Sequence, residues 1–201
     1  MEHRTAFTKP NATYQDVIDA PEGMRAEIVQ GDLYLQPRPA SPHGYASDIL
    51  AARLIYGFQL ANDGPGGWWI KIEPEIHFKG EKTNVLDPDL AGWRRERLPV
   101  YPRVPYMTLS PDWVCEIASP STARRDRGTK SDVYLAHGVA HYWILDPLGR
   151  TLEAFERSDA GRDSERWVRI GAWGGDDRVS VAPFAAITLD LGELWLEEPS
   201  Q

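Results

Sequence analysis

Two carboxylates lie inside otherwise apolar segments, and they are the residues of this sequence best suited to chemistry. Asp89 falls within LDPDLAGW, and Glu116 falls within DWVCEIAS. An ionised carboxylate that is buried without a partner costs several kcal/mol, so each needs a cation, a hydrogen-bond network or a metal. If the two segments form adjacent strands, the carboxylates meet and repel each other unless a proton or a metal lies between them. Such oxygen ligands favour Mg²⁺ or Mn²⁺.

Two further charged residues could complete such a site. Lys130 follows Glu116 in the sequence, and its ammonium could stabilise the charge that develops when water attacks a phosphodiester. Glu27, inside a predicted strand, is another acidic candidate. One alternative stays open at this point: Asp126 and Lys130 are four residues apart on one predicted helix and could form a structural ion pair instead.

Other catalytic classes lack the motifs that they need. The sequence contains no GxSxG, GxGxxG or HExxH motif, and the glycine-rich loop at 63–67 is too short and lacks a lysine for binding phosphates. We therefore expect no nucleotide cofactor. His137 and His141 have the spacing of a zinc-binding pair, but Gly138 between them is expected to end the helix. His43 begins a predicted helix and could face a cleft.

A carbohydrate hydrolase is a second alternative, because such enzymes need only two carboxylates at a fixed separation. Asp89 and Glu116 could form that pair, and the eight tryptophans could bind sugar rings. Several of these tryptophans stand in apolar strand patterns, however, which favours a place in the core: Trp68, Trp69, Trp113 and Trp143.

Composition indicates a folded protein with an acidic surface. The chain has 201 residues, of which 42% are hydrophobic and 26% charged, and its net charge is −8. The single cysteine, Cys115, excludes an internal disulfide framework. No apolar run approaches the ~20 residues of a membrane span, and the N-terminus has no hydrophobic signal core. We expect a cytoplasmic protein that does not bind membranes.

The acidic balance argues against a uniformly basic nucleic-acid-binding surface but allows a local basic cleft. Arginines gather after two of the predicted strands, where they could contact phosphates or simply form a solvated face. The candidate phosphate contacts are Arg94, Arg95, Arg97, Arg124, Arg125 and Arg127.

Hydrophobic periodicity and turn residues predict a mixed α/β fold without a linker or an internal repeat, so we expect residues 1–201 to form one domain. Residues 94–109, with three prolines and many arginines, are expected to form an irregular connection. Helices are expected at 13–20, 43–62 and 121–137. Strands are expected at 25–29, 33–35, 68–72, 75–78, 84–93, 113–118, 141–145, 151–155 and 166–170, with short ones at 179–181 and 187–189.

The order of these motifs resembles the Uma family of proposed restriction endonucleases, which belongs to the PD-(D/E)XK nuclease-like superfamily. The resemblance runs from about residue 13 to residue 196. It rests on an E-x-x-x-G-D hairpin that contains Glu27, on His43 after a proline-rich break, on PDL with Asp89, on PDWVCEIASPST with Glu116, on Lys130, and on GVAHYWILDP.

The resemblance implies a restriction-endonuclease-like core in which helices flank a central mixed β-sheet, with additional N- and C-terminal β-hairpins. It implies an endonuclease that uses Mg²⁺ or Mn²⁺, held by Asp89, Glu116 and the carbonyl of Ile117. Lys130 and Glu27 would be catalytic, and His43 and Tyr134 would be accessory residues.

One departure from the superfamily pattern concerns the lysine. A strict E-x-K motif would place a lysine at position 118, where this chain has Ala118. Lys130 would replace it from the following helix. DNA as substrate and a homodimer are further expectations. The acidic composition and the lack of a DNA-recognition motif leave a second hypothesis open, namely a non-catalytic binding or assembly module with the same fold.

Overall fold

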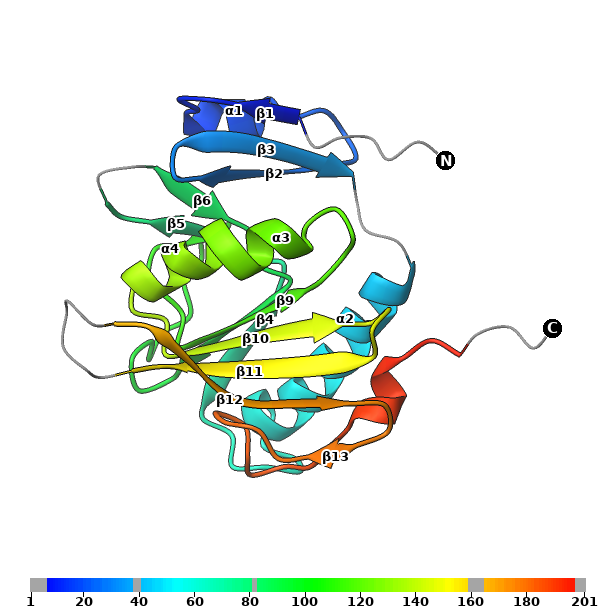
Figure 1. The fold of residues 1–201 in the computed structure, drawn as a ribbon. Coiled ribbons are helices and arrows are strands. Elements are labelled where there is room, and N and C mark those ends of the chain that lie inside the picture. The colour runs from blue at the N-terminus through cyan, green and yellow to red at the C-terminus, as the bar shows by residue number, and fades with distance from the viewer. Residues whose placement is uncertain (1–6, 38–40, 81–82, 159–164, 198–201) are drawn as a thin grey trace.

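The N-terminal part of the chain forms a helix and a three-stranded ribbon. The computed structural model describes residues 7–37, 41–80, 83–158 and 165–197 (Figure 1). Helix α1 (Tyr14–Ile18) begins at Thr13, which forms the expected capping box with Asp16. Strands β2 (Met24–Val29) and β3 (Asp32–Pro37) form the predicted hairpin. Its turn residues Gln30 and Gly31 both have positive φ, at 53° and 90°, as tight hairpin turns require.

This ribbon belongs to a sheet of six strands in the described residues, with the order β1-β3-β2-β6-β5-β8. Strand β8 lies in the connection that was expected to be irregular, where two residues pair in parallel with β5. The remaining strands of this sheet are β1 (Phe7–Lys9), β5 (Glu75–Phe78), β6 (Asn84–Leu86) and β8 (Tyr106–Met107).

A second sheet of six described strands has the order β12-β11-β10-β9-β7-β4. Its centre is β9, which is buried along its whole length and pairs in parallel with β10 and antiparallel with β7. The parallel pair requires a crossover, and the helical segment after β9 supplies it. The strands are β4 (Trp68–Ile72), β7 (Leu90–Arg94), β9 (Trp113–Ile117), β10 (His141–Asp146), β11 (Thr151–Arg157) and β12 (Trp167–Gly174).

The prediction of one strand at 84–93 was wrong. The chain leaves the first sheet after β6 and enters the second sheet at β7, with Asp87, Pro88 and Asp89 between them. Pro88 cannot donate a backbone hydrogen bond, so a continuous ladder through this point is disfavoured. Asp89 therefore lies where the two sheets meet, immediately before β7.

The predicted fold class is confirmed, and its strands form two mixed sheets. The N-terminal hairpin is part of the first six-stranded sheet and is not appended to the second. The C-terminal strands β13 (Arg178–Val179) and β14 (Leu189–Asp190) pair with each other. The proline-rich break before residue 41 lies partly outside the described residues.

Helices cover both faces of the second sheet. Helix α2 (Ser41–Leu54) continues as a π-helical turn, η1 (Ile55–Gln59), and packs with Trp113, Cys115 and Trp143 in one core cluster. No described helix has the length and apolar character needed to cross a membrane.

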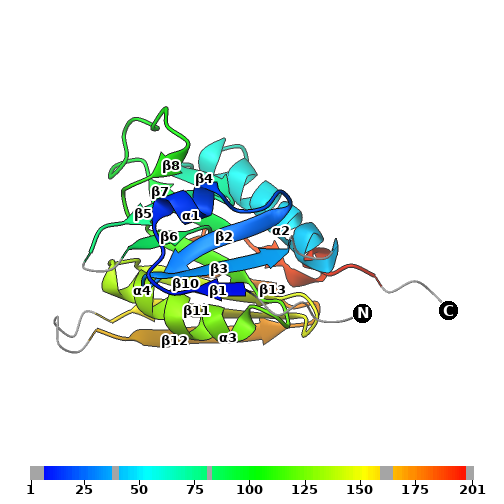
Figure 2. The ribbon, with the colours of Figure 1, turned by 90° about the horizontal axis from the view of Figure 1, so that it is seen from above.

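The opposite face is covered by α3 (Ala123–Arg125), the π-helical turn η2 (Asp126–Lys130) and α4 (Ser131–Ala136). The sequence predicted a continuous helix here. The segment lies between the two sheets in Figure 1, and in Figure 2, which is seen from above, β1, β2 and β3 lie nearer the viewer than the segment. Because side chains alternate along a strand, Val114 and Glu116 of β9 face this segment while Cys115 faces α2.

Gly92, in the middle of β7, provides a test of how tightly β7 and β9 are packed. A Cβ at this position would lie 3.2 Å from side-chain atoms of Ile70, Trp113 and Trp68. We expect Gly92→Ala to lower the free energy of unfolding by about 1–3 kcal/mol. Gly44→Ala, in α2 with open space around the added methyl, should raise it by about 0.5–1 kcal/mol. Urea unfolding measures both, and an unchanged Gly92→Ala would contradict the packing described.

Candidate active site

Lys130 joins the two sheets through two buried ion pairs. Its Nζ lies 2.7 Å from Oε1 of Glu116 on β9 and 2.7 Å from Oε1 of Glu27 on β2. The Lys130 side chain is only 2% exposed. Burial alone would lower the pKa of Lys130, but Glu116, Glu27 and Asp126 outweigh it and hold the pKa above its ordinary value. Lys130 therefore contacts Glu116 directly, and its described ion pairs do not include Asp126.

The helical segment after β9 delivers two side chains to the same carboxylate oxygen. Lys130 is the last residue of η2, and Tyr134 follows one turn later in α4. The Tyr134 hydroxyl donates a hydrogen bond of 2.5 Å to Oε1 of Glu116. Burial, together with Glu116, keeps the pKa of Tyr134 well above its ordinary value, so the phenol stays a neutral donor. Both contacts use Oε1 and leave Oε2 of Glu116 for another partner.

Glu27 is buried in β2 and binds three donors. Its Oε1 accepts from Lys130 and from the Asp87 N–H at 3.0 Å, and its Oε2 accepts from Arg125 at 3.2 Å. Burial alone would raise the pKa of Glu27, but Lys130 and the nearby arginines outweigh it and lower the pKa. Glu27 is therefore an ionised anchor for the lysine.

Asp89 is held by a different set of partners. Its Oδ1 accepts from Nη1 of Arg25 at 2.8 Å, and its Oδ2 accepts from the N–H of Ile117 at 2.7 Å. Nε2 of His43, near the start of α2, lies 3.3 Å from Oδ2. Burial would raise the pKa of Asp89, but His43 and Arg25 hold it below its ordinary value. Asp89 is therefore ionised at neutral pH.

Sequence reasoning missed Arg25, whose side chain is only 9% exposed. A signal was present: Arg25 is two residues before Glu27 in the same strand, and residues two apart share one face of a sheet. The face that carries Glu27 to the site therefore also carries Arg25.

Most of these residues line one pocket of about 220 Å³, but Glu27 and Tyr134 are not among its lining residues. The N–H of Ile117 points toward Asp89, and the N–H and C=O of one residue in a strand point to the same edge. The Ile117 carbonyl therefore faces the Asp89 side of β9. The pocket is lined by Arg25, Gln36, Pro37, His43, Asp89, Glu116, Ile117, Ser119, Pro120, Ser121, Thr122, Asp126 and Lys130.

The buried cluster around this pocket contains more acidic groups than cations. Burial raises the pKa of Asp87 to about 6, that of Asp126 to about 6 and that of Glu116 to about 8. Raised values of this kind arise where carboxylates share too little positive charge. The acidic groups are Glu27, Asp87, Asp89, Glu116 and Asp126, and the cations are Arg25, Arg125 and Lys130.

The donor set fits a divalent cation with hard oxygen ligands. Within the described ranges no group of three or more His, Cys, Asp or Glu side chains is placed to bind a metal. Two carboxylates, Asp89 and Glu116, together with the carbonyl of Ile117 line the pocket instead. Mg²⁺ is commonly bound by one or two carboxylates with the remaining positions taken by water. A divalent cation would also offset the excess of negative charge.

The sequence and the fold of the chain both resemble those of known proteins. The model of the Uma2 family, described as "Putative restriction endonuclease", matches residues 12–192. The chain belongs to the Uma2 family. A solved structure described as "a putative nuclease belonging to DUF820", from Anabaena variabilis ATCC 29413, is similar to the chain with a TM-score of 0.68 and 19% identity, over 91% of this chain and 97% of that one. This likeness shows a shared fold. No curated protein matched the sequence.

For this Uma2-family chain, the tryptophans do not support the carbohydrate-hydrolase alternative. Trp68, Trp113 and Trp143 are buried in the core, and Trp69 is half-buried beneath Arg95. No tryptophan lines the pocket among the described residues, whereas Lys130 lines it and pairs with Glu116. A zinc site is disfavoured too, because Gly138 has the positive φ of a helix end and separates His137 from His141.

The first group of expected phosphate contacts lies away from the pocket. Arg94 and Arg95 stack on the rings of Trp68 and Trp69, at 4.6 and 4.0 Å. Arg97 pairs with Asp112 at 2.7 Å. Arg94 follows Asp89 by five strand residues, which corresponds to about 16 Å.

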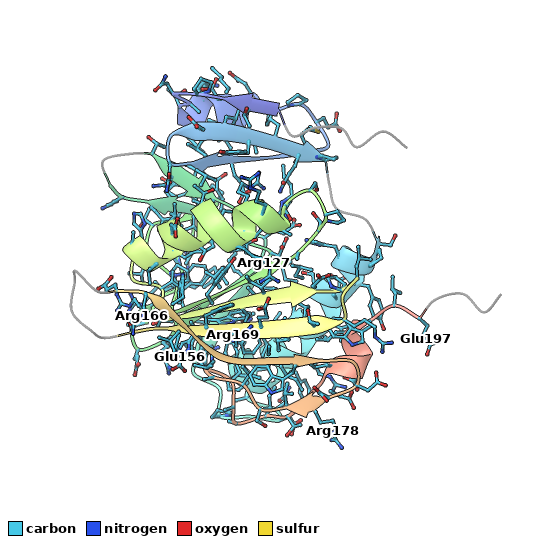
Figure 3. The ribbon with its side chains drawn as sticks, viewed as in Figure 1. Arg127, Glu156, Arg166, Arg169, Arg178 and Glu197 are labelled. Carbon is cyan, nitrogen blue, oxygen red and sulfur yellow. The ribbon has the colours of Figure 1, made fainter. Side chains whose placement is uncertain are left out.

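The second group has divided roles. Arg125 is largely buried and is bound to Glu27 and to Gln36. Arg127 forms an ion pair with Glu153 of β11. Figure 3 shows Arg127 between the α3–α4 segment and the strands of the second sheet. Arg124 is exposed and lines a depression next to the pocket.

Glu27 tests the strength of the buried charge cluster. We expect Glu27→Ala to lower the free energy of unfolding by about 3–5 kcal/mol, because it leaves Lys130 and Arg125 buried with too few partners. Glu193→Ala, which breaks the exposed ion pair with Arg53, should cost about 0–1 kcal/mol. Chemical unfolding of the three proteins gives both differences.

The pH dependence of this difference has a defined sign. The pKa of folded Glu27 is below its ordinary value of 4.5, so its contribution is complete above pH 4.5 and is lost as the pH falls below that value. The gap between wild type and Glu27→Ala should therefore shrink in acid, and a gap that widens would contradict the ionised anchor.

Proposed function

We propose that this Uma2-family chain is an endonuclease that hydrolyses phosphodiester bonds of DNA with Mg²⁺ or Mn²⁺. Family membership and the shared nuclease fold support a nuclease in general. The observation that carries the specific proposal is the convergence of Asp89, Glu116 and Lys130 on one pocket. The homodimer and the cytoplasmic location expected from the sequence stay predictions.

Asp89 and Glu116 would hold the cation, with the carbonyl of Ile117 as a third oxygen ligand. Mg²⁺ bound there would polarise a phosphoryl oxygen and lower the pKa of a bound water. Asp89 is suited to this role because it is already ionised. Burial raises the pKa of Glu116, so a bound cation would favour its ionised form further, beside Lys130.

Lys130 would stabilise the negative charge that develops on the phosphoryl group. Its raised pKa keeps the ammonium protonated at neutral pH, so it donates hydrogen bonds and does not act as a general base. Glu27 forms an ion pair with the ammonium of Lys130. This ion pair would fix the position of the ammonium before substrate binds. Such a fixed charge in a buried site is more effective than one that must reorient.

Tyr134 and His43 would position the two carboxylates. Tyr134 donates to Oε1 of Glu116, which would leave Oε2 to bind the cation. His43 approaches Oδ2 of Asp89 from α2, and its other ring nitrogen, Nδ1, is buried without a partner among the described residues. Both residues act through a carboxylate and are positioning residues in this proposal.

Substitution of the pocket residues tests the proposed activity. We expect Asp89→Asn and Lys130→Met each to lower the rate of DNA cleavage with Mn²⁺ by about 100-fold or more. Calorimetry should separate their roles, because Asp89→Asn weakens Mn²⁺ binding and Lys130→Met does not. Asp112→Asn changes a buried aspartate that does not line the pocket and should retain cleavage.

Cleavage that survives both pocket substitutions would overturn the proposed function. Absence of cleavage in wild type, with no heat on adding Mn²⁺, would favour the binding or assembly module instead. Unfolding curves of each variant separate a lost activity from a lost fold.

The pH dependence of metal binding tests the role of Glu116. Because binding requires the ionised carboxylate and burial raises the pKa of Glu116, Mn²⁺ affinity should rise between pH 6 and pH 8. Asp87→Asn, which removes a neighbouring acid with a pKa of about 6, should keep this rise. An affinity that is the same at pH 6 and pH 8 would contradict the assignment of Glu116 as a ligand.

A further inference from the structure

A second depression opens directly beside the pocket. It has a volume of about 490 Å³ and lies between the β1–β3 ribbon and the α3–η2 segment, which are neighbours in Figures 1 and 2. Ser121 lines both this groove and the catalytic pocket, so the two are continuous. The groove is lined by Thr8, Tyr34, Ser121, Arg124, Arg125, Gly128 and Thr129.

The groove differs in charge from the protein as a whole. The chain has a net charge of −8, yet the described residues that line the groove include two arginines and no carboxylate. Arg125 is already bound to Glu27 and Gln36. Arg124 is exposed and, in the part of the chain that the structure describes, takes part in no ion pair. Its guanidinium is therefore available to an anion from outside.

The remaining groove residues match the chemistry of a phosphate backbone. Four of the residues that line the groove carry hydroxyl groups: Thr8, Tyr34, Ser121 and Thr129. Arginine and hydroxyl side chains are among the groups that commonly contact nucleic-acid phosphates. A Cβ at Gly128 would meet no atom within 4 Å, so the backbone there is open to a ligand.

A cluster of hydroxyls lies where the groove joins the catalytic pocket. The Ser119 Oγ is 3.1 Å from the Ser121 Oγ and 3.0 Å from the Thr122 Oγ1. All three residues line the catalytic pocket. A strand that leaves the pocket toward the groove would thus pass these hydroxyl groups and enter a groove whose described lining contains no carboxylate.

We propose that this groove binds the sugar-phosphate backbone of one strand of the nucleic-acid substrate, next to the bond that is cleaved, with Arg124 as its principal phosphate contact. The proposal rests on the proposed function, because it places the scissile phosphate in the Asp89–Glu116 pocket. It also separates Arg124 from Arg127, which is three residues away and is paired with Glu153 on β11.

Fluorescence anisotropy with a labelled 20-nucleotide DNA, either single-stranded or as a duplex, measures the Kd for DNA. EDTA is present so that no divalent cation supports cleavage. We expect Arg124→Ala to raise Kd and to reduce the slope of log K against log salt by about 1. Arg178 is a matched control because its side chain is 74% exposed and Figure 3 shows it at the opposite end of the molecule. Arg178→Ala should leave both quantities unchanged.

A second pair of variants tests the effect of a negative charge in the groove. Gly128→Glu adds a carboxylate there, and Gly128→Ala is its uncharged control. Gly128→Glu should weaken DNA binding at least tenfold, whereas Gly128→Ala should bind as wild type does. Mn²⁺ calorimetry should give the same heat for both variants as for wild type, because neither changes the pocket. If Arg124→Ala and Gly128→Glu both bind DNA like wild type, the groove is not the binding site.

The two proposals fail in different ways. Wild-type cleavage combined with unchanged DNA binding by both Arg124→Ala and Gly128→Glu would overturn the groove and leave the nuclease function in place. Absence of cleavage combined with weakened binding by Arg124→Ala would overturn the nuclease function and leave the groove in place. No binding of either DNA by wild type would overturn the groove.

Discussion

The structure depends on one buried ammonium. Lys130 contacts Glu27 in the first sheet and Glu116 in the second, and it comes from a helical segment that lies between them. The same contact thus joins two sheets and aligns the residues of the pocket. Removing either carboxylate would leave charge buried without compensation, which costs far more than an exposed ion pair contributes. Fold and site are therefore coupled through a single side chain.

The charge cluster around this lysine lowers the stability of the fold, because it buries more carboxylates than cations. Such a cluster is consistent with a binding site. The acidic groups outnumber the cations, and burial raises the pKa values of Glu116, Asp126 and Asp87. A core built only for stability would replace such groups with apolar side chains of similar size. Perturbed acidic groups that line one pocket are typical of sites at which a cation or a reacting group binds. The excess of negative charge thus supports the oxygen-ligand metal site proposed for Asp89 and Glu116.

The same electrostatic reasoning accounts for how an acidic chain could bind a polyanion. The metal site would attract the phosphodiester through the cation, while the adjoining groove offers Arg124 and hydroxyl groups without a carboxylate. The net charge describes the electrostatic field at long range, whereas binding at the contact surface depends on the few charged and polar groups located there. Arg94, Arg95 and Arg97 illustrate the difference, because their charges are used in stacking and in an ion pair within the protein.

The sequence by itself determined most of the elements and the identity of the key side chains. Glu116 was recognisable because a carboxylate interrupts an otherwise apolar run of strand length. The Thr13 cap and the Gly31 turn follow from local backbone chemistry. Only the tertiary structure decided which partners meet. Local pattern did not reveal that Pro88 divides a strand between two sheets, that Arg25 binds Asp89, or that Lys130 contacts Glu116 and Glu27 in preference to Asp126. These contacts join residues 14 to 103 positions apart, and their geometry is set by how the sheets pack, which periodicity along the chain does not encode.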